Sequence, residues 1–208
     1  MRVIKVRGTG EPMVGNMLTP IPGEELDYRA EIAPIGSRSY AESVRDIRAH
    51  LRGIDAAGQP WIGVAYSLGA AGLGDYAAFD RPEHCAGVVL VADPRRHRSQ
   101  CANGGVSLAN WGIAGERRIA SVPVWSFAVP DDPITACPGD NGARTIANTV
   151  TGLTQPVPGR WWDAGYTLAW AWKYFQQNSR HCVYGIEKMP GDHRTYVQAA
   201  ADAVRGVA

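Results

Sequence analysis

The sequence has no excess of charge of one sign, no long apolar run and few cysteines. Its 208 residues include 21 lysines and arginines against 20 acidic residues, so no strong field favours nucleic acid as a partner. No apolar run approaches the length of a membrane span, which argues against a transmembrane helix. The first residues lack the apolar core of a signal peptide, so we expect no export signal.

Metal and nucleotide sites also lack their signatures. The four cysteines, Cys85, Cys101, Cys137 and Cys182, show neither CxxC nor zinc-type spacing, and we expect no metal and no cofactor. Without an export signal we predict free thiols, with disulfides as the alternative. The loop 8–12 has two glycines but not the third glycine and helix of a nucleotide loop. With 45% hydrophobic residues, the chain can bury the core of a single domain, residues 1–208.

The stretch around Ser67 carries the main chemical signal. Ser67 follows a β-rich apolar run and precedes small residues, which is the small-x-Ser-x-Gly pattern of a nucleophile elbow. Ala65 and Gly69 are the small neighbours that a sharp turn at the serine requires. The next helix would point its positive end at a developing oxyanion. The pattern predicts a nucleophilic serine; the alternative is an ordinary strand-to-helix turn with Ser67 as the helix N-cap.

Apolar periodicity and turn residues place the other elements. The continuous apolar run 86–92 is typical of a parallel sheet covered on both faces. Ser39 and Glu42 form a capping box before the clearest helix, and Asp192 is the expected cap of the last helix. We expect strands at 3–6, 28–32, 61–66, 86–92 and 123–129, and helices at 39–57, 68–79, 143–150, 163–177 and 194–204.

Two later loops supply partners for the serine. In hydrolases with this elbow the chain order is serine, acid, histidine. The strand 123–129 runs into Asp131 and Asp132, which are the candidate acids. His181 and His193, both before the last helix, compete as the base.

Two further segments stand out by composition. The basic run 95–98 is expected to be a solvated loop, with contact to a polar or anionic substrate as the alternative. Residues 154–180 crowd aromatic side chains together, and we expect about half of them to pack against the body. The rest would line an acyl-binding cleft or a lipid-facing rim. The aromatic residues are Trp161, Trp162, Tyr166, Trp170, Trp172, Tyr174 and Phe175.

Taken together, five motifs resemble the cutinase-like serine esterases, which include the lysin B enzymes of phages that infect mycobacteria. The resemblance implies an α/β-hydrolase fold with three layers, a central, mostly parallel sheet and a small helical insertion, residues 154–180, before the catalytic histidine. The family's elbow is usually Gly-Tyr-Ser-Gln-Gly, from which this chain departs at two positions. The motifs are Arg7–Pro12, Tyr40–Val44, Ala65–Gly69, Asp132–Ile134 and His181–Gly185.

The resemblance also implies roles for single residues. By position Ser67 is the nucleophile, Asp132 the acid and His181 the base. The His-x-x-Tyr-Gly pattern favours His181 over His193. The backbone N–H groups of Thr9 and Leu68 would form the oxyanion hole, so the departure at Leu68 costs little.

Within this family, two features favour lysin B over a secreted cutinase. We expect no signal peptide, and about fifty residues separate Asp132 from His181. The implied reaction is hydrolysis of the ester joining mycolic acids to arabinogalactan. We expect a phage-encoded monomer, made in the host cytoplasm and acting on the cell envelope at lysis. The alternatives are a secreted cutinase-like lipase acting on triglycerides or polyesters, and a non-catalytic module that binds wall or lipid.

Overall fold

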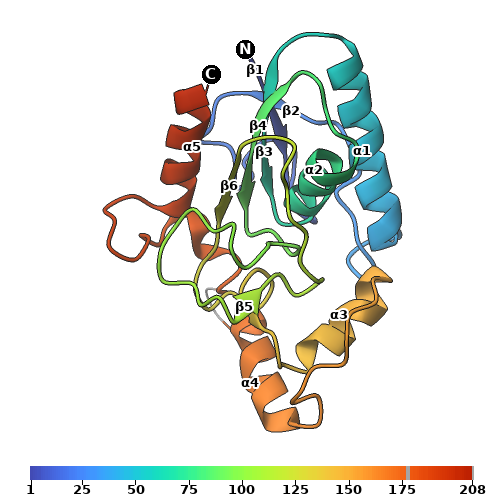
Figure 1. Ribbon diagram of the computed structural model, residues 1–208, viewed down its shortest axis with the longest axis vertical. Coiled ribbons are helices and arrows are strands. Elements are labelled where there is room, and N and C mark those ends of the chain that lie inside the picture. Colours follow the sequence, from blue (N-terminus) through green and yellow to red (C-terminus); the bar gives the residue numbers. More distant parts are fainter. Residues whose placement is uncertain (177–178, 208) are drawn as a thin grey trace.

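A five-stranded sheet forms the centre of the molecule (Figure 1). The computed structural model describes residues 1–176 and 179–207. The strand order is β2-β1-β3-β4-β6, and every adjacent pair in it is parallel. The strands are β1 (Arg2–Val6), β2 (Glu24–Glu25), β3 (Trp61–Tyr66), β4 (Cys85–Val91) and β6 (Val124–Phe127); β5 (Asn110–Trp111) and β7 (Cys137–Pro138) form a separate antiparallel pair.

Helices cover both faces of the sheet. On one face lie α1 (Tyr40–Ala56) and α2 (Leu68–Phe79), and on the other lies α5 (Tyr196–Val207). This confirms the expected three-layer α/β architecture with a parallel central sheet. Two further helices, α3 (Ala143–Thr151) and α4 (Ala164–Phe175), lie together beyond one end of the sheet, at the bottom of Figure 1.

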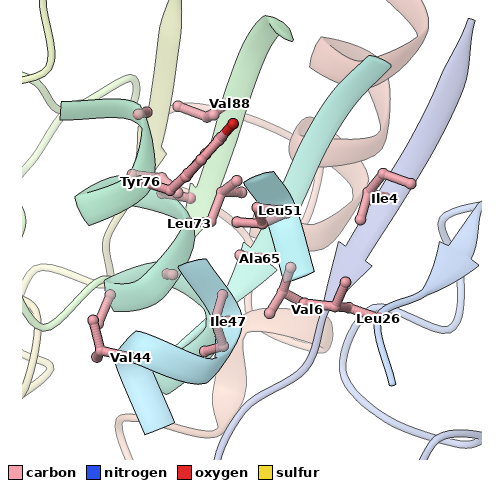
Figure 2. Close-up of a cluster of buried hydrophobic side chains, with 14 of the residues drawn as sticks. Ile4, Val6, Leu26, Val44, Ile47, Leu51, Ala65, Leu73, Tyr76 and Val88 are labelled. Atoms are coloured by element: carbon pink, nitrogen blue, oxygen red, sulfur yellow. The ribbon is translucent and has the colours of Figure 1, made fainter. Parts of the chain in front are cut away.

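The predicted capping box starts α1. The Ser39 hydroxyl accepts from the Glu42 N–H at 3.2 Å, and the Glu42 carboxylate accepts from the Ser39 N–H at 2.8 Å. Val44, Ile47 and Leu51 then recur on one helix face and point into the core beneath it (Figure 2). Each such buried aliphatic side chain stabilises the fold by about 1.5–3 kcal/mol.

The central strand β3 supplies side chains to both cores, and all six of its residues are buried. Trp61 and Ala65 belong to the cluster beneath α1 and α2, whereas Ile62, Val64 and Tyr66 pack toward α5. A strand apolar on both faces can only lie inside a covered sheet. The nucleophile candidate therefore follows a strand that is buried along its whole length.

The predicted strand 28–32 is wrong. On the side of β1 opposite β3, the pairing segment is instead β2, through Ile4↔Glu24 and Lys5↔Glu25. Tyr28 is buried outside the sheet, and its hydroxyl donates to the Arg7 carbonyl at 2.6 Å. An aromatic side chain at position 28 therefore serves tertiary packing rather than strand pairing.

Two helix ends also differ from expectation. Thr195 rather than Asp192 caps α5, because the Thr195 hydroxyl accepts from the Gln198 N–H at 3.2 Å. Asp192 is paired with Arg194 at 2.6 Å. The helix expected at 163–177 is α4, and its predicted last residue, Gln177, lies outside the described residues.

All four cysteines are free thiols, of which Cys85 and Cys137 are buried, Cys101 is half-buried and Cys182 is exposed. Within residues 1–176 and 179–207, no helix combines the length and apolar character needed to cross a bilayer. The same ranges contain no group of three or more histidine, cysteine or acidic side chains placed to hold a metal ion.

Candidate active site

Ser67 lies on a strained turn between β3 and α2. Its backbone has φ 53° and ψ −117°, a region that non-glycine residues rarely adopt. Its N–H donates to the Val91 carbonyl at 3.0 Å, which ties the turn to the end of β4. The side chain makes no capping hydrogen bond to α2, so the ordinary N-cap interpretation is wrong. The hydroxyl is free to point away from the helix, as a nucleophile elbow requires.

The structure brings together the three residues that the sequence nominated from distant segments. The Ser67 Oγ lies 2.8 Å from His181 Nε2, and His181 Nδ1 lies 2.8 Å from Asp132 Oδ2. Asp132 is fully buried and the His181 residue is 5% exposed, whereas Ser67 is half-buried. A neutral imidazole protonated on Nδ1 can therefore accept the serine proton on Nε2 while the carboxylate fixes its tautomer.

Aromatic residues hold the imidazole in place, and sequence reasoning placed none of them beside the base. The Tyr66 ring stacks on the His181 ring at 5.6 Å, and its hydroxyl donates to the His181 carbonyl at 2.6 Å. Tyr174 of α4 lies 5.8 Å from the same imidazole. Burial raises the pKa of Tyr66 well above its ordinary value, so this hydroxyl remains a donor. In the sequence, the only sign of this role for Tyr66 was its position directly before Ser67.

The two alternate residues lie elsewhere. His193 has a side chain that is 92% exposed, and its nearest acidic partner is Asp192 at 3.6 Å. Asp131 binds Arg180 at 2.7 Å and Lys173 at 3.2 Å. Burial opposes ionisation of Asp131, but the two cations outweigh it and lower the pKa of the carboxyl. Asp131 thus anchors the segment before the histidine.

The first turn of α2 approaches the end of β1 without intervening side chains. A Cβ atom at Gly69 would lie 2.1 Å from the Val6 carbonyl oxygen, so only glycine fits. The preceding residue, Leu68, begins α2 directly after the serine. Its backbone N–H group belongs to the helix's positive end, where a developing negative charge is stabilised.

The loop that contains Thr9 borders the same turn. Glu11 holds this loop: its carboxylate accepts from the Gly8 N–H at 2.6 Å and from the Met17 N–H at 2.8 Å. Gly8 packs on the ring of Tyr66, where a Cβ atom would lie 2.6 Å from Cδ1. Thr9 therefore follows Gly8, which contacts Tyr66, the residue before the serine. The donor role of Thr9 stays a prediction.

The basic run 95–98 is structural rather than solvated, which corrects the expectation. Arg96 is 1% exposed and donates to backbone carbonyls, among them that of Thr135 at 2.9 Å. Arg95 pairs with Asp75 of α2 at 2.8 Å, and Arg98 pairs with Glu116 at 2.8 Å. These guanidinium groups are occupied by the protein itself, which leaves no basic cluster here for an anionic substrate.

The aromatic segment divides into two stripes along α4. Tyr166, Trp170 and Tyr174 are half-buried and face the body of the protein. Leu168, Trp172 and Phe175 recur at i, i+4 and i+7 and are 64–73% exposed. About half of the aromatic residues pack inward, as expected. The outward stripe forms an apolar face on the helix that carries Tyr174, and Trp161 and Trp162, just before this helix, are also exposed.

Comparison with solved structures agrees with this architecture. Lysin B from Mycobacteriophage D29 matches with a TM-score of 0.60 and 14% identity, covering 98% of each chain, so the two share a fold. An acetyl xylan esterase matches with a TM-score of 0.49 and 15% identity over 73% of this chain and 95% of its own. A cutinase-like protein from Cryptococcus sp. gives 0.47 and 19% over the same shares. No protein-family model and no curated protein matches the sequence.

Proposed function

We propose that this protein is a serine esterase in which Ser67 is the nucleophile, His181 the general base and Asp132 the group that orients the base. The observation that carries the proposal is the continuous chain of hydrogen bonds from the Ser67 hydroxyl through the imidazole to a buried carboxylate. It begins at a strained turn facing a helix N-terminus, where stored strain and a fixed dipole are typical of catalytic sites.

The reaction follows from this arrangement. His181 Nε2 removes the hydroxyl proton as Ser67 Oγ bonds to the ester carbonyl carbon, and the carbonyl oxygen becomes an oxyanion. The N–H groups of Thr9 and Leu68 stabilise that charge, each contributing about 3 kcal/mol. The carbon–oxygen bond to the alcohol then breaks, and the imidazolium gives its proton to the leaving oxygen. A water molecule, deprotonated by the same imidazole, releases the acid from the acyl-enzyme.

The finer proposal concerns the substrate, which we take to be an ester of a long-chain acid. The exposed apolar stripe of α4 and Tyr174, which packs against the base, lie on different faces of the same helix, so a lipid held on α4 would be bound by an element that borders the site. The fold shared with lysin B along nearly the whole chain supports the ester between mycolic acids and arabinogalactan as that substrate. In this proposal the protein acts on the envelope of a mycobacterium at lysis.

Labelling with a fluorophosphonate probe tests the nucleophile. We expect the wild-type protein to be modified on Ser67 and to hydrolyse a short p-nitrophenyl ester, and Ser67→Ala to do neither. Ser99→Ala, a loop serine whose hydroxyl contacts His97, is the matched control and should behave as wild type. Labelling that persists in Ser67→Ala would refute the assignment, and a wild type that never reacts would leave a non-catalytic binding module.

The substrate needs a separate comparison. Purified mycolyl-arabinogalactan and emulsified tributyrin should be offered at matched ester concentrations, and release of acid measured. We expect hydrolysis of both, with a higher kcat/KM for the mycolyl ester. Activity on tributyrin alone would favour the cutinase-like lipase and reject the finer proposal while keeping the esterase.

A further inference from the structure

One oxygen of the buried acid serves two hydrogen-bond donors. Asp132 Oδ2 accepts from His181 Nδ1 at 2.8 Å and from the Tyr184 hydroxyl at 2.6 Å. The other oxygen accepts from the Ile134 N–H at 2.8 Å. Tyr184 comes from a short 3₁₀ helix, η1 (Val183–Gly185), directly after the base. The carboxylate is therefore shared between the imidazole and a phenol that the reaction scheme above does not use.

The phenol is itself held as a donor. Its oxygen accepts from the Val129 N–H at 3.1 Å, just after β6. A hydroxyl that accepts one hydrogen bond donates the next one more strongly. Tyr184 is fully buried, and burial followed by the Asp132 charge raises its pKa well above the ordinary value. It therefore keeps its proton throughout the range in which an esterase of this kind works.

Resting on the proposed function, we infer that Tyr184 is a positioning residue that sets the basicity of the catalytic base through Asp132. Its hydroxyl draws charge from Oδ2, so the carboxylate stabilises a protonated His181 less than an unshared carboxylate would. The imidazole then releases its proton at lower pH. It is thereby unprotonated, and ready to accept the serine proton, over a wider range.

The surroundings of the imidazole leave this role to Tyr184. The titratable groups near the imidazole and its carboxylate come from several elements, and in the described part of the chain none of the others donates to Asp132. They are Tyr66 of β3, Tyr174 of α4, Cys182 and Arg180 on either side of the base, Asp131 beside the acid and Cys137 of β7. Tyr66 instead donates to the backbone of His181.

The test compares Tyr184→Phe with Tyr196→Phe. The Tyr196 ring lies 5.2 Å from that of Tyr184 and is equally buried, but among the described residues its hydroxyl has no hydrogen-bond partner. The His181 resonance is followed by NMR against pH, with a His181→Ala sample for assignment. In Tyr184→Phe we expect its titration midpoint to rise by about half a pH unit or more. The midpoint of the acid limb in the pH profile of kcat/KM should move to higher pH by the same amount. We expect kcat to be lowered and KM to stay within about twofold of wild type.

The NMR titration needs no turnover, so its result stands even if the wild type proves not to be an esterase. An unchanged midpoint in Tyr184→Phe, or equal shifts in both variants, would overturn the inference, because the second outcome reports only loosened packing. If Tyr184→Phe does not fold, 3-fluorotyrosine introduced at position 184 replaces it. This more acidic phenol is a stronger donor and should lower the midpoint instead, and a midpoint that stays in place would refute the role.

Discussion

Replacing Asp132 by asparagine should nearly abolish catalysis without disturbing the fold. The amide keeps an oxygen for the Ile134 N–H, but its NH₂ group then faces both His181 Nδ1 and the Tyr184 hydroxyl. The imidazole can satisfy that donor only by moving its proton to Nε2, and this removes the acceptor that Ser67 needs at 2.8 Å. A wrong tautomer in such a chain costs about 10⁴-fold in kcat, or about 5 kcal/mol of barrier.

The neighbouring residue provides the control. Asp131→Asn makes the same chemical change one position earlier, where the side chain is 38% exposed and binds Arg180 and Lys173. Exposed ion pairs contribute about 0–1 kcal/mol, so we expect kcat within about threefold of wild type. Hydrolysis of p-nitrophenyl butyrate measures both variants, and circular dichroism checks their folding. A loss below tenfold in Asp132→Asn, or equal losses in both, would refute the assignment of the acid.

Three further predictions rest on packing and exposure. Gly69→Ala should lower the free energy of unfolding by about 1–3 kcal/mol, because its Cβ would meet the backbone of β1 at 2.1 Å; Gly206→Ala, with open space around it, should not. Thermal denaturation measures both, and equal stability would contradict the close approach. Trp172→Ser, at a side chain 64% exposed, should reduce hydrolysis of a lipid emulsion but not of a soluble ester, and equal effects on both would argue against a lipid-facing stripe. In the native protein Cys182 should react first with a thiol reagent at pH 8, whereas Cys85, whose pKa burial raises to about 12, should react only on unfolding; the reverse order would contradict the burial pattern.

The turn at Ser67 was predictable because its determinants are local. The apolar run before the serine and the small residues Ala65 and Gly69 lie within a few positions, and the backbone conformation depends on little else. Asp132 and His181 were found by chain order and by resemblance, which needs no knowledge of distance. Their contact, between residues 49 positions apart, is visible only in the folded chain.

Features that depend on distant partners escaped the sequence. The sequence places Tyr184 in the His-x-x-Tyr-Gly pattern but gives it no role, because Asp132, which accepts its hydrogen bond, is 52 positions away. Arg96 lies in a charged run typical of a solvated loop, yet its side chain is buried and donates to backbone carbonyls. Tyr28 carries a side chain that favours strands, but β1 pairs with Glu24 and Glu25 instead.

The ion pair between Asp131 and Arg180 lies immediately outside the hydrogen bond between Asp132 and His181. The segment between acid and base is thus a loop whose two ends are joined by an ion pair and a hydrogen bond. Closing a flexible loop costs only about 0.6 kcal/mol more for each doubling of its length. The outer part of the aromatic insert can therefore change in length at little cost, as long as Lys173 and Tyr174, which contact Asp131 and His181, stay in place.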